Sequence, residues 1–198
     1  MGLAGYNPLM GQHLKTGNPN IFCDRAFVAH YQIAAADADA AAAAYIEAAT
    51  VLDAEKVTTV LAKDLSAQPP TPRVLSITGD ADDSVGNVVI NGTDANGAAL
   101  TETIVGTGKN TVPGTRAFAS VTSIVFPIGD GTSTISVGIT DDVGLPFCLP
   151  YNTVLLILNN ATATTVASGS YSATVIAQNY VNPTAPLAGN QIDIYFLV

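Results

Sequence analysis

The residues of this chain whose side chains could do chemistry are few and far apart. The two histidines, His13 and His30, lie in different segments, and neither has a Cys, His or acidic residue at the spacing of a metal site. A zinc site needs three or four ligands at workable spacing. We therefore expect no metal at either histidine.

The best candidate for a cation site is the acidic phrase GDADDSVGN, which contains Asp80, Asp82 and Asp83. Carboxylate oxygens in a loop are the ligands that Ca²⁺ prefers, but no Glu follows at the distance that an EF-hand loop requires. Two interpretations remain, a Ca²⁺ site and a solvated acidic turn between strands. We expect the turn, and we interpret the pair Asp141 and Asp142 in the same way.

Motifs of nucleophilic catalysis and phosphate binding are missing from the sequence. It contains neither Gly-x-Ser-x-Gly nor a P-loop. The glutamates Glu47, Glu55 and Glu102 lie in segments without an aromatic platform for a sugar ring, as a glycosidase would need. Because no nucleophile has a base placed beside it, we expect no enzymatic activity, no catalytic residues and no cofactor.

The two cysteines, Cys23 and Cys148, are too few for a disulfide framework. One alternative is two free thiols that pack as small apolar groups. The other is one disulfide, within the chain or between chains, that forms after release into an oxidising medium. An inter-subunit bond belongs to the second alternative because Cys23 falls in the N-terminal arm described below.

The composition points to a protein that buries its surface against neighbours. Only 12% of the 198 residues are charged, about half of the ~25% that is usual in soluble proteins. The net charge is −9, and no Lys or Arg follows Arg116. Contacts with nucleic acid or an anionic membrane need clustered basic residues, so we expect neither partner. No secretory signal is visible, and we expect synthesis in a cytosol.

The segments before residue 70 are the least regular part of the sequence. Residues 1–25 contain scattered Gly and Pro without periodicity, which predicts an extended N-terminal arm. Residues 26–69 contain a strand at 26–33 and a candidate strand at 57–61. For the Ala-rich segment 34–50 a helix and an irregular extended chain both remain open. The arm offers these apolar candidate partner contacts: Tyr6, Leu9, Met10 and Phe22.

From residue 70 to 198 short runs of Val, Ile, Thr and Phe alternate with Gly, Asp and Asn, as in antiparallel strands joined by tight turns. Asp94, Asn96 and Gly97 form the clearest turn, and with Asp82 we take Asp94 and Asn96 as candidate partner contacts. The fold class predicted is all-β, an antiparallel β-sandwich or jelly-roll-like domain. The predicted strands are 73–79, 86–91, 98–105, 116–126, 134–139, 153–158, 171–178 and 191–198.

Four phrases carry a resemblance to structural proteins of tailed bacteriophages. They are PRVLSITGDADDSVGNVVINGTDANGAALTETI, GTRAFASVTSIVFP, VGITDDVGLPFCLPYNTV and IDIYFLV, which occur in this order between about residues 70 and 198. The chain resembles capsid decoration or cement proteins. That resemblance implies a virion component on the capsid surface, made in the host cytoplasm. It also implies a homotrimer whose partner is the major capsid protein. Two alternatives remain open: a tail, neck or tail-tube subunit, and a host-surface or carbohydrate-binding module.

Overall fold

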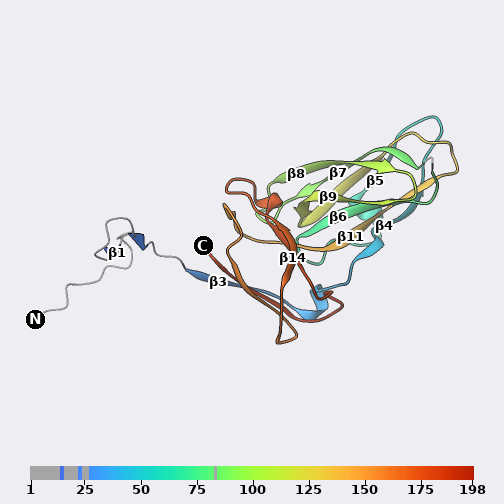
Figure 1. Ribbon diagram of the computed structural model, residues 1–198. Helices are drawn as coiled ribbons and strands as arrows, with labels where there is room; N and C mark the ends of the chain where they lie inside the picture. Colours follow the sequence, from blue (N-terminus) through green and yellow to red (C-terminus); the bar gives the residue numbers. More distant parts are fainter. Residues whose placement is uncertain (1–13, 16–21, 24–26, 83) are drawn as a thin grey trace, which may run out of the picture.

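The computed structural model describes residues 14–15, 22–23, 27–82 and 84–198. The chain is all-β and folds as an antiparallel β-sandwich, as predicted (Figure 1). The predicted arm lies outside the described residues, except for two short strands, β1 (Leu14–Lys15) and β2 (Phe22–Cys23), which pair with each other.

The first layer of the sandwich, here named sheet I, has the strand order β5-β10-β7-β8. In β8 burial alternates at every residue, with Glu102 and Ile104 inside and Thr101 and Thr103 outside. Such alternation is expected when one face of a sheet covers a core and the other is solvated. The strands of sheet I are β5 (Thr58–Leu61), β7 (Val85–Thr93), β8 (Ala99–Thr107) and β10 (Ser120–Phe126).

The second layer, sheet II, has the order β14-β15-β11-β6-β9, and β4 pairs with β11 on the side where β15 also lies. Its strands are β4 (Ala42–Val51), β6 (Arg73–Gly79), β9 (Thr111–Phe118), β11 (Thr134–Gly144), β14 (Val166–Ser170) and β15 (Tyr180–Pro183). The core between sheets I and II includes Leu75, Ile77, Val88, Ile90, Ile104, Phe118, Ile124, Phe126, Ile135 and Val137.

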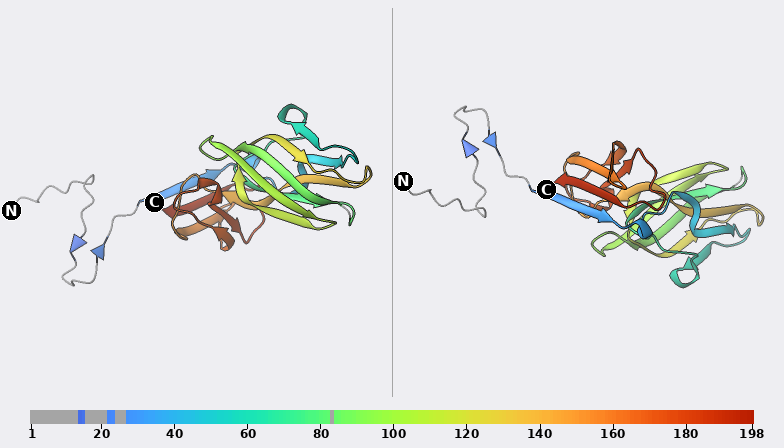
Figure 2. Two further views of the ribbon diagram at one scale, coloured as in Figure 1. Left: turned by 90° about the horizontal axis from the view of Figure 1, so that it is seen from above. Right: turned by 90° about the horizontal axis from the view of Figure 1, so that it is seen from below.

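A third sheet, sheet III, has the order β13-β12-β16-β3. One of its faces packs on a second core. Strand β11 links the two cores, because Ile135 to Ile139 belong to the first and Val143 to the second. In Figure 2 the C-terminus and the start of β3 lie together at one end of the molecule, and the sandwich extends away from them. The strands are β3 (Val28–Ile33), β12 (Val154–Asn159), β13 (Thr162–Thr164) and β16 (Ile192–Leu197).

The segment 26–69, predicted to hold two strands and an Ala-rich connection, contributes one strand to each sheet. β3 pairs with β16, β4 with β11 and β5 with β10. Residues 42–50 of the Ala-rich segment are therefore part of strand β4, neither a helix nor an irregular chain. The residues before them form the 3-10 turn η1 (Ala35–Asp37) and an irregular connection. Helix propensity is a weak preference, and pairing along β11 together with burial of Ile46 outweighs it here.

Two predicted strands differ from the structure. The segment 116–126 is two strands in two sheets, separated at Ala119. The segment 171–178 is not a strand but ends in the 3-10 turn η3 (Ile176–Gln178). Asn179 explains the second difference: its buried amide donates to Ser172 O and Val175 O and thereby closes a compact loop.

The helical content of the described residues consists of η1, η3 and a further 3-10 turn, η2 (Ala62–Asp64). None of these turns is long and apolar enough to cross a membrane.

Candidate functional site

The predicted acidic turn is part of the sandwich framework. Asp80 Oδ1 accepts hydrogen bonds from the backbone N–H of Thr134, at 2.7 Å, and from Ser84 Oγ, at 2.9 Å. The Thr134 bond is the main reason why the pKa of Asp80 lies below its usual value. Asp82 is 94% exposed with Lys109 Nζ at 3.9 Å, and Asp83 lies outside the described residues. Among the residues that the structure describes, no three His, Cys, Asp or Glu side chains are grouped to hold a metal ion.

The predicted contacts at the β7–β8 turn differ in their accessibility. Asp94 Oδ1 accepts from the backbone N–H groups of Asn96, at 2.9 Å, and Ala98, at 3.0 Å, so its carboxylate holds the turn. Gly97 supplies the positive φ of 79° that the turn requires. Asn96 is exposed, so its side chain is available to a partner.

Arg73 is a fully buried charge that the sequence analysis did not single out. Its Nε donates to Thr140 O at 2.9 Å, its Nη2 to the same oxygen, and its Nη1 to Asp39 O at 2.9 Å. Asp141 lies 3.7 Å from Nη2. Burial lowers the pKa of Arg73, but a guanidinium stays protonated in proteins. Arg73 therefore joins the loop before β4 to β11 and has a structural role.

Glu102 joins the edges of sheets I and II. Its Oε1 accepts from the backbone N–H of Thr115 at 2.6 Å and from Thr115 Oγ1 at 2.9 Å. Gly114 leaves room for the carboxylate, because a Cβ there would lie 2.6 Å from Oε2. Oε2 is buried and has no hydrogen-bond partner among the described residues. The geometry ties β8 to β9 across the sandwich.

His30 lies in a polar cluster on the outer face of sheet III. Its Nε2 is 2.7 Å from Asp193 Oδ1, and its ring stacks on Tyr195 with centroids 4.4 Å apart. Gln32 and Gln191 donate to the same carboxylate. The Gln191 bond is the first cause of the lowered pKa of Asp193. The cluster fastens β3 to β16. His13 and the arm contacts Tyr6, Leu9 and Met10 lie outside the described residues.

The structure bears on one of the two cysteines. Cys148 is a free and exposed thiol, so it is not packed as a small apolar group. The side chains of Cys23 and Phe22 lie outside what the structure describes. A disulfide between Cys148 and Cys23, within the chain or between chains, stays a prediction.

Exposed apolar side chains gather where three strands of sheet III end. Phe27 and Val198 exchange two backbone hydrogen bonds, and Leu197 N–H donates to Thr153 O at 3.1 Å, which brings the ends of β3, β16 and β12 together. Phe147 packs edge-on against Phe196, with centroids 5.7 Å apart. We name this region the end surface; its exposed apolar side chains are Phe27, Val28, Phe147, Tyr151, Leu155 and Leu156.

A groove of about 460 Å³ runs along β12 and continues the end surface. Strand β13 covers β12 only from Ile157 to Asn159, so residues 154–156 have no strand partner on that side among the described residues. A bulge between Val154 and Leu156 exposes Leu155 and Leu156 together. The groove lining comprises Asn152, Val154, Leu155, Leu156, Ile157, Ala163, Thr164, Thr165 and Val166.

This surface was not predicted from the sequence, although the sequence contains a signal for it. The run VLLIL at 154–158 is continuously apolar in a strand that has one solvated face, where polar residues should alternate. An unbroken apolar run in such a strand indicates that both of its faces are covered, in the monomer or by a partner.

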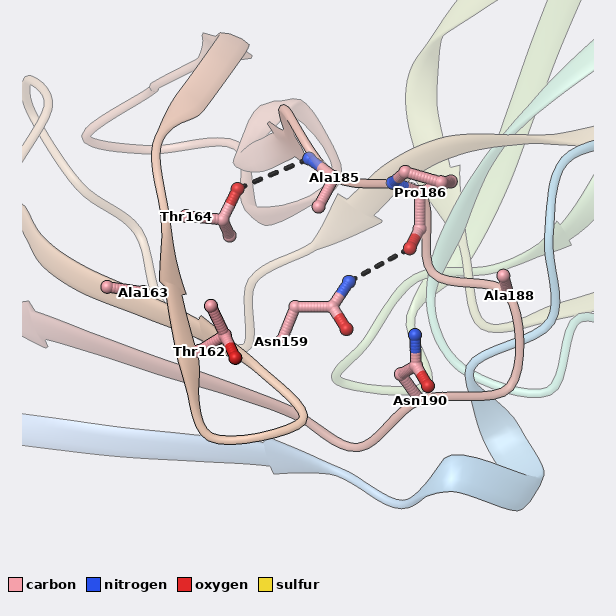
Figure 3. A pocket seen from close by; sticks show the side chains of 8 residues that line it. All are labelled: Asn159, Thr162, Ala163, Thr164, Ala185, Pro186, Ala188 and Asn190. Atoms are coloured by element: carbon pink, nitrogen blue, oxygen red, sulfur yellow. Dashed lines mark hydrogen bonds between the residues drawn. The ribbon is translucent and has the colours of Figure 1, made fainter.

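A second pocket, of about 330 Å³, lies at the other end of the β12–β13 hairpin (Figure 3). Asn159 Nδ2 donates to Pro186 O at 2.9 Å, and Ala185 N–H donates to Thr164 Oγ1 at 3.2 Å. These bonds hold the loop before β16 against the hairpin. The residues that line this pocket are small and uncharged. The polar side chains of Asn159 and Thr164 are already engaged in the bonds that hold the loop.

Neither a family model, nor a curated protein, nor a solved structure significantly matches this chain. The resemblance to phage structural proteins stays a prediction.

Proposed function

We propose that this protein is a structural virion protein that decorates a tailed-phage capsid and stabilises it by bridging neighbouring capsid subunits. It acts as a homotrimer on the capsid surface, and the major capsid protein is its partner. The exposed turns around Asp82 and Asn96 are proposed capsid contacts, and the N-terminal arm is a proposed contact between copies.

The end surface is the observation that carries the assembly part of this proposal. Tyr151 is 67% exposed, Phe27 63% and Leu155 56%. Contiguous apolar side chains on a soluble protein mark interaction sites, and aromatic residues are enriched in the centres of interfaces. We propose that copies of the chain meet here. A trimer then contacts several capsid subunits at once, which multiplies weak single contacts by avidity.

The test is capsid binding by the full chain. The protein is mixed with empty capsids of the phage or prophage that encodes it, and bound protein and capsid rupture temperature are measured. We expect saturable, stoichiometric binding and a higher rupture temperature. A protein that ignores these capsids contradicts the proposal, and growth of the pure protein into tubes supports a tail subunit instead.

A matched pair of variants separates assembly from folding. Tyr151→Ser in the end surface should abolish the trimer and weaken capsid binding about 100-fold, because avidity is lost. Val105→Ser, on the outer face of β8 and 54% exposed, is the control and should leave both unchanged. Equal behaviour of the two variants would remove the end surface from the proposal.

A carbohydrate-binding role is the second candidate, since Phe27, Phe147 and Tyr151 carry exposed aromatic rings. Aromatic rings are the platforms on which sugar rings stack. Binding on a glycan array that is lost in Tyr151→Ser, without any capsid binding, would favour this role.

A further inference from the structure

The groove beside β12 has room for a further segment of polypeptide chain. We propose that residues 1–26 of one copy dock there on a second copy, as an added strand along residues 154–156 of β12. This inference rests on the proposed function in one respect, since both take the end surface as a contact between copies.

The groove has the features of a site for strand addition. On the side away from β16, β12 has a strand partner only from Ile157 onward among the described strands. The Val154 N–H already donates to Asn152 Oδ1 at 3.0 Å, so the added strand pairs with the other backbone groups of this stretch. Free backbone groups at a sheet edge are a template for an extended segment. In such recognition main-chain hydrogen bonds supply affinity, and neighbouring pockets take alternate side chains. Leu155, Leu156 and Val166 line the groove and select an apolar segment.

The N-terminal segment has the matching chemistry. It carries apolar side chains at intervals, among them Leu9, Met10 and Phe22. Its charges are Lys15, Arg25 and Asp24, so it is net positive. This leaves five of the seven basic and fifteen of the sixteen acidic residues for positions 27–198. The opposite net charges favour the encounter of the segment with the body of another copy, whereas the apolar groove supplies the contact itself.

The position of the segment favours a second copy as its host. The segment joins the body at Phe27, at the end surface itself. Its described strands β1 and β2 pair with each other and with none of the described strands of sheets I, II and III. Twenty-six extended residues span up to roughly 85 Å, whereas neighbouring strands lie only about 5 Å apart. The segment is therefore long enough to reach the same groove on an adjacent molecule.

The two cysteines make the exchange measurable in the full chain. Cys23 belongs to the segment, and Cys148 is an exposed thiol that follows Phe147 of the end surface. Docking brings Cys23 of one copy near Cys148 of the other. Two full-length variants, Cys148→Ser and Cys23→Ser, are produced together with different tags and oxidised mildly with diamide. Any Cys23–Cys148 disulfide in this mixture has formed between copies.

We expect such a mixed dimer on a non-reducing gel, with the Cys23–Cys148 peptide confirmed by mass spectrometry. Leu155→Ser combined with Leu156→Ser should lower its yield at least about tenfold, since two apolar groove contacts are lost. The control Val105→Ser should not. Phe22→Ser leaves residues 27–198 unchanged and should lower the yield as well, which guards against a groove variant that misfolds.

Three outcomes would overturn the inference: no Cys23–Cys148 bond between copies, a yield that the groove variants leave unchanged, or a wild-type bond that forms only within one chain. Capsid binding separates this inference from the proposed function. Capsid binding without the mixed dimer refutes the segment exchange alone, and the mixed dimer without capsid binding refutes the capsid role alone.

Discussion

The buried guanidinium of Arg73 shows how a single side chain can set the geometry of this fold. It is fully buried, and its charge faces Asp141 at 3.7 Å and two backbone carbonyls. A buried charge is tolerated only when it is paired and hydrogen-bonded, and removal of one partner leaves the other polar groups without compensation. The planar guanidinium can bond two carbonyls in fixed directions, whereas an ammonium group is a point charge.

We therefore expect Arg73→Lys to destabilise the protein although it conserves the charge. The expected loss is about 2–4 kcal/mol in the free energy of unfolding, because the bonds to Thr140 O and Asp39 O are not reproduced. Urea unfolding followed by circular dichroism measures it. Arg116→Lys is the control, since among the described residues that guanidinium makes one long, exposed bond, to Thr101 O at 3.4 Å. Similar losses in both variants would show that Arg73 has no special role.

Asp130 gives a pH-dependent prediction. Hydrogen bonds from Thr132 Oγ1 and from the backbone N–H and Oγ of Ser133 hold the pKa of Asp130 well below its usual value. A depressed pKa in the folded state favours folding when the carboxyl is ionised. This contribution is complete above the unfolded pKa of about 4 and is lost as the pH falls below it.

Asp130→Asn should therefore lower the melting temperature at pH 7, and its difference from wild type should shrink as the pH falls from about 4 to 2. Thermal unfolding at a series of pH values measures this. Asp82→Asn is the exposed control and should follow the wild-type curve. A difference for Asp130→Asn that stays constant, or that grows in acid, would contradict the linkage.

Strand β4 shows why the secondary structure of the Ala-rich segment could not be read from propensity. Its backbone comes so close to β11 that a Cβ on Gly138 would overlap the carbonyl oxygen of Ala42. The pairing of the two strands contains two register shifts. The combination of Gly138 on one strand and small side chains on the other permits this close approach, and the resulting hydrogen bonds outweigh the helix propensity of alanine.

Gly138→Ala should displace β4 and cost about 1–3 kcal/mol of stability, as overpacking of a filled site does. For a chain of this size each kcal/mol corresponds to about 2–4 °C in melting temperature, and calorimetry measures the shift. Ala48→Thr, on an exposed position of β4, is the control and should stay within about 0.5 kcal/mol of wild type. A neutral Gly138→Ala would mean that β4 adjusts without loss.

The distribution of charge in the whole molecule determines how its assembly should respond to salt. No basic residue follows Arg116, and the end surface consists of apolar side chains. Contacts made by burial of apolar area are not screened by ions, whereas contacts between exposed charges are.

We expect the oligomer to persist when NaCl is raised from about 0.05 to 0.5 M, a range over which the Debye length falls severalfold. Sedimentation velocity at several protein concentrations measures the association. Dissociation into monomers at the higher salt concentration would show that charge pairs, and not the end surface, hold the copies together.

Strands, turns and fold class were predictable because their signals are local. The β-rich composition of 73–79, the alternation along 191–198 and the Asp94–Gly97 turn predicted elements that the structure contains. Alternation of apolar and polar residues along a strand shows which side chains face a core, but not which other strands complete that core.

The choice of sheet partners depended on contacts between residues far apart in the chain, which no local pattern records. Strand β4 joins β11, β3 joins β16, and the segment 116–126 divides between two sheets. The end surface depends on the same long-range pairing, because β13 is too short to cover β12 and three strand ends meet there. Composition indicated that this protein buries surface against neighbours. The place where that surface lies was set only by the packing of the three sheets, since exposure is a property of the assembled fold.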